Sequence, residues 1–201
     1  MLTKTLHALV AHPWVYEQVR LLVGARRIDR RLAHHIETLP LGSLVLDLGG
    51  GTGVLRRLLP MTCTYVCLDT DVLKLRGFSK GSSNGCAVLS DATQAPVRSE
   101  SADLVFCTLV SHHLPDETLA RLIRESYRLL KKNGRFIFLD AVWAPARWAG
   151  WLLWKFDRGR YPRTAEALHR VMSAHYKIVE WERFAIYHEY ALCVAAKSVT
   201  E

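Results

Sequence analysis

The sequence of 201 residues has no long apolar run, no internal repeat and no low-complexity segment. Its most hydrophobic stretch, WAGWLLW at residues 148–154, is far shorter than the ~20 apolar residues that a membrane-spanning helix needs. In the N-terminal segment, His7, His12, Pro13 and Glu17 interrupt any signal-like apolar region, and no small-residue cleavage site follows. We therefore expect a protein that does not cross a membrane and is located in the cytoplasm.

Cysteine use gives no sign of a disulfide framework or of a metal site. The cysteines are odd in number, form no C-x-x-C pair and mostly lie inside apolar runs. We expect buried thiols in a reducing compartment and no bound metal. The five cysteines are Cys63, Cys67, Cys86, Cys107 and Cys193.

Acidic residues are outnumbered by basic ones, 19 to 27, which gives a formal net charge of +8. Such a charge suits nucleic acid or anionic lipid as a partner. The basic residues, however, stand in scattered groups such as GARRIDRR, RLLKKNGR and FDRGRYPR, without one dense tract. We favour a solvated basic face on a soluble enzyme, with nucleic acid as the less favoured partner.

The apolar residues that are present predict an α/β fold in a single domain, residues 1–201. Five short continuous apolar runs alternate with polar or helix-like segments: SLVLDL, CTYVCLD, CAVLSD, DLVFCTLV and RFIFLDA. Continuous apolarity is typical of strands buried on both faces. It predicts a doubly wound parallel sheet with helices on either side.

Two regions are predicted to be helical. Residues 1–40 show apolar positions at helical spacing and would form an N-terminal cap. Residues 116–132 carry the clearest amphipathic pattern, in which Asp116 would cap the start and Gly134 would end the helix.

The C-terminal half departs from the simple alternation of strands and helices. Residues 142–175 predict a helical insertion over one edge of the sheet, with Trp148, Trp151 and Trp154 at helical spacing. Residues 176–201 contain two strand-like stretches that predict a closing hairpin. The core would then span residues 41–141.

Four glycines stand in five positions directly behind the first apolar run. In the pattern D-x-G-x-G-x-G that begins at Asp47, they lie between a strand-like run and the helix-like TGVLRRLL. Glycine permits positive φ and lets a ligand approach the backbone. A dinucleotide fingerprint would need a third small residue where this chain has Val or Arg, and a P-loop would need a following G-K-S/T. A nicotinamide-dependent oxidoreductase is therefore a disfavoured alternative, and a flat, polar small molecule is expected across the turn.

Acidic side chains end or nearly end the first three strand-like runs. Asp47 precedes the glycines, Asp69 ends YVCLD and Asp91 ends VLSD. Open α/β sheets bind ligands at the carboxyl ends of their strands. There Asp69 could accept both hydroxyls of a ribose, and Asp91 could accept the amino group of adenine. The ordered set favours a ligand site over a tight turn without a ligand.

In these motifs the sequence resembles the class I S-adenosylmethionine-dependent methyltransferases, in particular the methyltransferase type 11-like group that acts on small molecules. VLDLGGGTG is similar to the first family motif, LDTD to the second, SDAT to the third and ADLVFCTLVSHHLPD to the fourth, and LLKKNGRFIFLD follows. The resemblance covers residues 44–141. It implies a Rossmann-like sheet of order 3-2-1-4-5-7-6 with strand 7 antiparallel, and S-adenosyl-L-methionine as cofactor.

The resemblance also implies which residues bind the cofactor: Asp47, Gly49, Gly51, Gly53, Asp69, Asp91, Ala92 and Thr108. The first four would hold the methionine end and approach the ribose. Asp69 would bind the ribose hydroxyls, Asp91 with Ala92 would recognise adenine, and Thr108 would lie beside the sulfonium.

A general base is optional in this chemistry because the donor is already activated. His112 and His113 follow the fourth strand and titrate near neutral pH, so they are the candidate catalytic residues. A structural role for the HHL segment is the competing interpretation. Asp140 is expected to be a hydrogen-bonding residue and not a base.

The acceptor pocket is expected beneath the N-terminal helices and the insertion. These segments carry five of the six tryptophans: Trp14, Trp143, Trp148, Trp151 and Trp154. Either they are ordinary core contacts, or they line a pocket for an apolar, quinone-like or lipid acceptor. In the second case a membrane surface or an anionic headgroup could be contacted by Arg147, Lys155, Arg158 and Arg160.

A small-molecule acceptor is favoured because motifs of nucleic-acid methyltransferases are missing. The chain has no D/N-P-P-Y/F motif, no Pro-Cys nucleophile and no evident tetrad of the ribose 2′-O enzymes. An RNA or protein methyltransferase, or a cofactor-binding partner subunit without activity of its own, remains an alternative.

Overall fold

The computed structural model describes residues 24–37, 39–81, 85–147, 150, 154 and 159–198. Several residues of the predicted cap and insertion lie outside this part of the chain: Trp14, Trp148, Trp151, Lys155 and Arg158. The helices predicted within residues 1–23 lie outside it as well.

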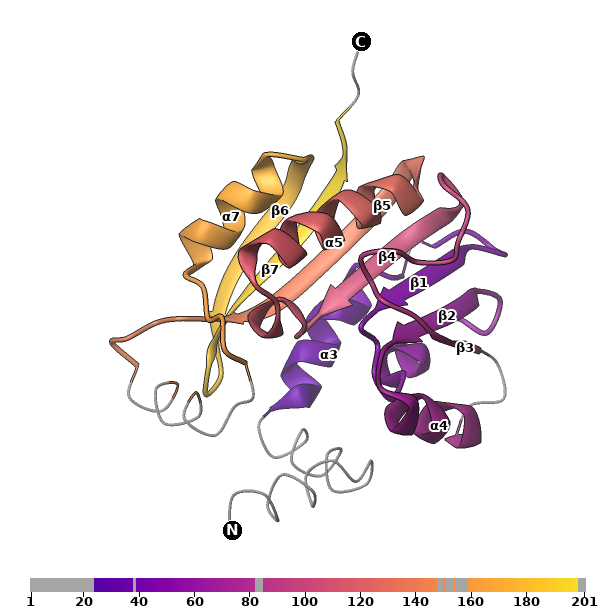
Figure 1. Cartoon of the computed structure of the whole chain (residues 1–201), viewed down its shortest axis with the longest axis horizontal. Helices are drawn as coiled ribbons and strands as arrows, with labels where there is room; N and C mark the ends of the chain where they lie inside the picture. The colour runs from indigo at the N-terminus through magenta and orange to yellow at the C-terminus, as the bar shows by residue number, and fades with distance from the viewer. Residues whose placement is uncertain are drawn as a thin grey trace.

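A seven-stranded sheet of order β3-β2-β1-β4-β5-β7-β6 forms the centre of the molecule (Figure 1). Neighbouring strands from β3 to β5 are parallel, whereas β7 is antiparallel to both β5 and β6. This arrangement confirms the predicted fold class. The strands are β1 (Leu44–Leu48), β2 (Thr64–Asp69), β3 (Cys86–Leu89), β4 (Ala102–Thr108), β5 (Leu130–Val142), β6 (Tyr176–Ala185) and β7 (Glu189–Lys197).

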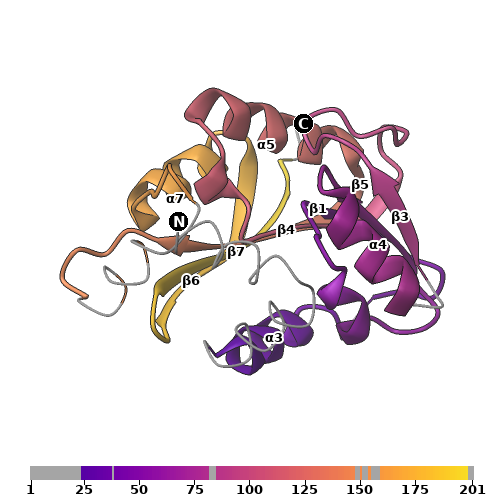
Figure 2. The same cartoon turned by 60° about the horizontal axis from the view of Figure 1, so that its bottom comes forward.

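Helices cover both faces of the sheet, as Figure 2 shows most clearly. On one face, α5 (Asp116–Leu129) buries its apolar side against β4 and β5, and α7 (Ala165–Ser173) packs against β6 and β7. On the other face lie α3 (Ala25–His34) and α4 (Val72–Gly81). Two hydrophobic clusters therefore enclose the central strands, which explains why those strands are apolar throughout. Within the described residues, no helix is both long and apolar enough to span a bilayer.

Helix α5 is shorter than predicted. It ends at Leu129, because Leu130 already pairs with Ala102 of β4 and begins strand β5. Gly134 lies inside that strand, where a Cβ would stand 2.9 Å from the carbonyl oxygen of Ala102. Asp116 lies in the first turn, and its side chain makes no capping hydrogen bond at the N-terminus of the helix. The predicted cap was wrong, since Pro115 is the N-cap residue. The predicted end was also wrong, because residues 130–132 belong to strand β5.

Three further predictions need correction. The helix-like TGVLRRLL forms only a short 3-10 helix, η1 (Val54–Leu58), where the buried guanidinium of Arg56 donates to the carbonyl oxygens of Leu59 and Pro60. Strand β3 lies at the edge of the sheet and has exposed residues at both ends, so it is not buried on both faces. Cys86 on that strand is exposed, whereas the other four cysteines are buried.

Candidate functional site

The glycine turn lies at the carboxyl end of β1, next to the carboxyl end of β2. The amide groups of Gly49 and Gly50 donate to the carbonyl oxygen of Leu68, at 2.8 and 3.1 Å. The backbone is left-handed at Gly49, Gly51 and Gly53, with φ of 74°, 58° and 65°. Residues with a Cβ adopt this conformation at a cost, so the alternating glycines are required by the path of the chain.

The three left-handed glycines face different surroundings. A Cβ on Gly49 would stand 2.5 Å from Val110 Cγ2, and one on Gly53 would stand 2.2 Å from Phe78 Cδ2. On Gly51, by contrast, the nearest atoms would be 3.5 Å away or more. Gly49 and Gly53 thus make room for the protein's own side chains, whereas a Cβ on Gly51 would only reach ordinary contact distance of Lys74 and Asp69.

Asp69, at the end of β2, is hydrogen-bonded to Gly51 of this turn. Its Oδ2 accepts from the amide of Gly51 at 2.8 Å, and its Oδ1 accepts from the amide of Asp71 at 2.8 Å. The residue is 9% exposed. An ionised carboxylate has about four acceptor positions, so each oxygen can accept a further hydrogen bond. The structure therefore brings Asp69 and Gly51 together, as the sequence predicted.

Asp47 is buried beneath the turn with an incomplete set of partners. Its Oδ2 accepts from the hydroxyl of Tyr65 at 2.5 Å, whereas its Oδ1 has no hydrogen-bond partner among the described residues. Burial raises the pKa of Asp47 to about 7, an effect that the Tyr65 hydrogen bond opposes and the nearby Asp69 increases. Buried polar atoms are almost always paired. A cationic ligand group would supply what Oδ1 lacks.

Asp91 and Ala92 lie in the loop that follows β3. Asp91 is exposed, and its Oδ1 accepts from the amide of Thr93 at 2.8 Å. The loop begins beside the glycine site, because the amide of Ser90 donates to the carbonyl oxygen of Asp69 at 3.0 Å. Its start is thus placed against the end of β2, with the carboxylate of Asp91 accessible to solvent.

Thr108 ends β4 and is half-buried. The next residue, Leu109, has a φ of 57°, which is costly for a residue with a Cβ. Its amide donates to the carbonyl oxygen of Leu139 at 2.8 Å, so pairing with β5 holds the turn in place. This turn directs the chain into the 3-10 helix η2 (Ser111–His113), which carries both candidate catalytic histidines.

Asp140, at the carboxyl end of β5, holds His112 in a fixed orientation. Asp140 Oδ1 lies 2.5 Å from His112 Nδ1 and also accepts from the amide of Ala141, while Oδ2 accepts from the Ser111 hydroxyl and the His112 amide. The hydrogen-bonding role predicted for Asp140 is confirmed. Burial alone would raise the pKa of this carboxyl group, but His112 and the other donors outweigh burial and lower it. An ionised Asp140 favours the tautomer of His112 with its proton on Nδ1.

His113 differs from its neighbour in exposure to solvent. It is exposed, whereas His112 is 6% exposed. The two rings lie 4.1 Å apart between centroids. Of the two candidates, only His112 combines burial with a carboxylate partner.

Arg163 also belongs to this site, although no sequence pattern marked it as a site residue. Its guanidinium is nearly buried and donates to the carbonyl oxygens of Ser111 and Leu114 at 2.8 and 2.7 Å. The amide of Tyr161 donates to the carbonyl oxygen of His112 at 3.0 Å. The end of the insertion is thereby bonded to η2. Arg163 belongs to the basic group FDRGRYPR, and only the tertiary structure separates it from the solvated arginines.

Trp154 of the insertion lies beside His112, and further aromatic rings from the insertion and the closing hairpin lie next to it. Ring centroids of Trp154 are 5.7 Å from His112, 6.4 Å from Trp143 and 5.0 Å from His188. His188 in turn lies 6.1 Å from Tyr190. We refer to Trp143, Trp154, His188 and Tyr190 as the aromatic array.

A protein-family model described as a methyltransferase domain matches residues 46–138, the segment that contains the glycine turn, Asp69, Asp91 and η2. Over these residues the chain matches a class I S-adenosylmethionine-dependent methyltransferase domain. The three strand-end motifs and the sheet order are those that the resemblance implied.

Two curated methyltransferases match part of this domain. The tRNA (carboxymethyluridine(34)-5-O)-methyltransferase of Arabidopsis thaliana is 31% identical over 115 residues, which are 57% of this chain and 27% of that protein. The malonyl-[acyl-carrier protein] O-methyltransferase of Methylococcus capsulatus is 35% identical over 100 residues, 47% of this chain and 36% of that protein. The chain thus spans about a quarter to a third of the length of these relatives.

Solved methyltransferases share the fold of this domain. The geranyl diphosphate C-methyltransferase of Streptomyces coelicolor, solved with Mg²⁺, geranyl-S-thiolodiphosphate and S-adenosyl-L-homocysteine, superposes with a TM-score of 0.70. The superposition covers 86% of this chain and 76% of that chain at 12% identity. At this identity the comparison establishes the fold of the methyltransferase domain and leaves the acceptor open.

The residues of the site fit S-adenosyl-L-methionine. The orphaned Oδ1 of Asp47 would suit a positively charged group such as an α-amino group, and Asp69, bonded to Gly51, can accept further hydrogen bonds from hydroxyls. When bound, the cofactor supplies a methyl group on a sulfonium that needs no further activation. In the part of the chain that the structure describes, no group of His, Cys, Asp or Glu side chains could hold a metal ion.

Proposed function

We propose that this methyltransferase domain methylates an oxygen, nitrogen or carbon nucleophile of a small acceptor that is apolar or aromatic. The observation that carries the proposal is the buried Asp140–His112 pair, held at the same end of the sheet as the glycine turn. Val110 links the two, because it precedes η2 and packs against Gly49. A candidate proton acceptor and the candidate cofactor turn are therefore neighbours.

Within this proposal, His112 takes the proton of the acceptor. Asp140 keeps the Nδ1 proton of His112 in place, so that Nε2 is the basic nitrogen of the neutral ring. As the bond from the acceptor to the methyl carbon forms and the bond from sulfur to that carbon breaks, Nε2 receives the proton that the acceptor loses. Orientation of the two reactants can contribute ~7 to 11 kcal/mol toward lowering the barrier. For a carbon or already ionised nucleophile, the same histidine would only orient the acceptor.

The cofactor is assigned to the other half of the site. We assign its amino group to Asp47, its ribose hydroxyls to Asp69 and its adenine to Asp91 with Ala92. Thr108 lies between this half and η2, and we assign it to the sulfonium end of the cofactor. The hydrogen bond from the Gly51 amide to Asp69 supports this assignment, since it holds the proposed ribose acceptor against the glycine turn.

An apolar or aromatic acceptor is supported by the aromatic array. Trp154 lies beside His112, Trp143 and His188 lie beside Trp154, and Tyr190 lies beside His188. Aromatic side chains bind flat apolar groups well because they offer large, rigid contact surfaces. Arg147 is half-buried and donates to the carbonyl oxygen of Ile186 at 3.4 Å, so it is directed toward the protein and not toward a membrane.

A second candidate function is methylation of an RNA acceptor. It is favoured by the likeness to a tRNA methyltransferase and by Arg26, Arg27 and Arg30, which are exposed on helix α3. Phosphate contacts by arginine make RNA binding strongly dependent on salt. The triple variant Arg26→Gln, Arg27→Gln, Arg30→Gln would abolish methylation of tRNA but leave a small acceptor unaffected.

The proposed function is tested with the purified chain and radiolabelled S-adenosylmethionine. Binding of S-adenosylhomocysteine is measured by calorimetry, and label transfer is measured to phenols, amines, quinols and bulk tRNA. Transfer to a small aromatic acceptor, with a strong loss in His112→Asn, is the expected result. Absence of binding to S-adenosylhomocysteine would overturn the proposal. Binding without transfer to any acceptor would favour a partner subunit without activity of its own.

A further inference from the structure

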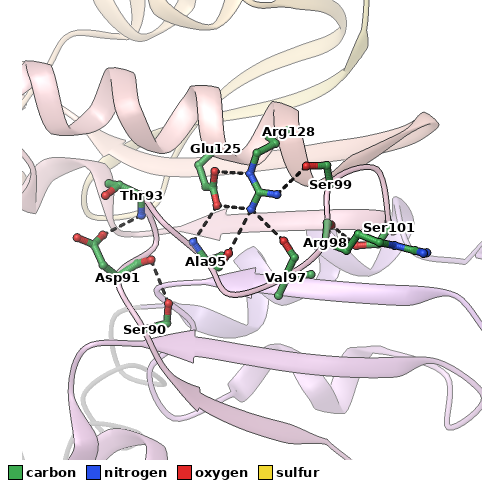
Figure 3. A network of polar contacts seen from close by, with 10 residues as sticks. All are labelled: Ser90, Asp91, Thr93, Ala95, Val97, Arg98, Ser99, Ser101, Glu125 and Arg128. Carbon is green, nitrogen blue, oxygen red and sulfur yellow. Dashed lines mark hydrogen bonds and ion pairs between the residues drawn. The ribbon is translucent and has the colours of Figure 1, made fainter.

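The loop that follows β3 is held by two charged residues of helix α5, Glu125 and Arg128 (Figure 3). Glu125 Oε1 accepts from the amide of Ala95 at 2.8 Å. Arg128 Nη2 donates to the carbonyl oxygens of Ala95 and Val97, at 3.1 and 3.0 Å. Both backbone polar groups of Ala95 are thus bonded to one ion pair on the helix.

The contacts of Arg128 extend along the loop. Its Nη1 donates to the hydroxyl of Ser99 at 2.8 Å, and its own carbonyl oxygen accepts from the amide of Glu100 at 2.9 Å. A single arginine therefore bonds to four residues of the loop. The guanidinium makes its hydrogen bonds in a fixed plane, so it fixes the direction of the loop as well as its distance from the helix.

The ion pair itself is well ordered by its geometry. Glu125 and Arg128 are one helical turn apart, and the carboxylate receives both Nε and Nη2 of the guanidinium at 2.7 Å. The hydrogen bond from Arg128 lowers the pKa of Glu125, and the same contact raises the pKa of Arg128. The Glu125 side chain is 10% exposed, so the carboxylate is largely withdrawn from solvent.

This attachment lies close in sequence to the proposed adenine-binding residues. Asp91 is four residues before Ala95, and the short segment between them is a hydrogen-bonded turn in which Asp91 Oδ1 and its carbonyl oxygen accept from Thr93 and Gln94. Asp91 is exposed, and among the described residues its Oδ2 accepts no hydrogen bond. The Thr93 amide orients the Asp91 carboxylate within the turn, and the segment that carries both groups ends at Ala95, where Glu125 and Arg128 hold it.

We propose that Glu125 and Arg128 are positioning residues that give the domain its selectivity for adenine, by fixing Ala95 and with it the carboxylate of Asp91. The inference rests on the proposed function. A carboxylate accepts from the amino group of adenine but is repelled by the carbonyl oxygen that hypoxanthine has at the same position. Selectivity between these two bases should therefore depend on how firmly the loop is held.

The test compares the affinities of S-adenosylhomocysteine and S-inosylhomocysteine, measured by calorimetry on the full chain. The wild-type protein should prefer the adenine compound by about tenfold or more, since a site built to accept from an amino group rejects a ligand without it. Arg128→Gln should lower this preference to about threefold or less, mainly through weaker binding of the adenine compound. Glu125→Gln should lower it as well, because the neutral amide holds the guanidinium less firmly.

Two further variants separate positioning from folding. Arg183→Gln removes ion pairs with Glu166 and Glu189, far from the loop in the fold, and should keep the wild-type preference. Arg128→Lys keeps the charge without the planar fork, so it should give an intermediate preference and serves if Arg128→Gln does not fold.

A wild-type preference in folded Arg128→Gln or Arg128→Lys would overturn the inference. Equal loss of affinity for both compounds would also overturn it, because that outcome indicates a general structural role. If the wild-type protein binds neither compound, the proposed function fails instead, so the two failures are distinguishable.

Discussion

The buried carboxyl group of Asp47 should make the stability of the domain depend on pH in a direction opposite to that of most acidic residues. Its pKa in the folded state is raised from the ordinary 3.8 to about 7, because burial disfavours the charged form. Below the unfolded pKa the group is protonated in both states, and the residue carries no penalty. As pH rises, the unfolded chain ionises first, and stability falls until the folded state also ionises near pH 7.

The size of this effect follows from the shift of pKa. One pKa unit corresponds to about 1.4 kcal/mol, so the full cost above pH 7 is about 4 kcal/mol. Between pH 5 and pH 8 the wild-type protein should lose roughly 2.5 kcal/mol of unfolding free energy through this residue alone. Asp47→Asn has no proton to lose and keeps an oxygen that can accept from the hydroxyl of Tyr65.

The assay is urea unfolding of both proteins at pH 5, 6, 7 and 8, without cofactor. The other ionisable groups are common to both proteins, so the difference between their unfolding free energies isolates Asp47. The variant should become more stable than the wild type by an amount that grows with pH and levels off above pH 7. A difference that is the same at all four pH values would refute the reasoning.

Four further outcomes are expected. Gly51→Ala should weaken binding of S-adenosylhomocysteine at least ~tenfold, because its Cβ would stand 3.8 Å from Oδ2 of Asp69, the proposed ribose acceptor, yet lower stability by only about 1 kcal/mol. Gly53→Ala should instead lower the melting temperature strongly, because its Cβ would collide with the ring of Phe78 at 2.2 Å; thermal unfolding of both variants decides this. Arg163→Leu should lower kcat and leave the KM for S-adenosylmethionine nearly unchanged, because it releases η2 and not the glycine turn. Steady-state kinetics with an acceptor that the wild type methylates measures both parameters. Cofactor binding at pH 7 should release protons from wild-type protein and fewer from Asp47→Asn, a difference that calorimetry in two buffers of unlike ionisation enthalpy detects.

The strands of the sheet were predictable because each one has a recognisable local sequence pattern. Five continuous apolar runs correspond to the five parallel strands, and the antiparallel hairpin follows from two strand-like stretches with a short connection. The order of the strands was a different kind of prediction, since it came from the resemblance of the strand-end motifs to a family. Physical patterning alone does not determine which strand lies beside which.

The ends of elements and the roles of single glycines were not predictable from the sequence. Helix α5 stops before Leu130 because pairing with Ala102 outweighs the local helical preference of residues 130–132. Likewise, the sequence shows alternating glycines but not that Val110 and Phe78 fill the space beside two of them. Both outcomes depend on residues that are distant along the chain, and local patterns do not register such neighbours.

The site shows the same division. Asp69 was placed correctly beside the turn, because the carboxyl ends of adjacent parallel strands must meet. Arg163 was missed because a buried arginine and a solvated one look alike in a basic segment. Its hydrogen bonds to Ser111 and Leu114 exist only in the folded protein, where the end of the insertion lies against η2.

Val110 occupies the space that a side chain on Gly49 would need, and two residues later the chain reaches His112. The Val110 side chain thus sets the distance between the glycine turn and the 3-10 helix that carries His112. Val110→Ala would let the turn and the histidine shift independently, so under the proposed function this residue would set the spacing between the two reactants.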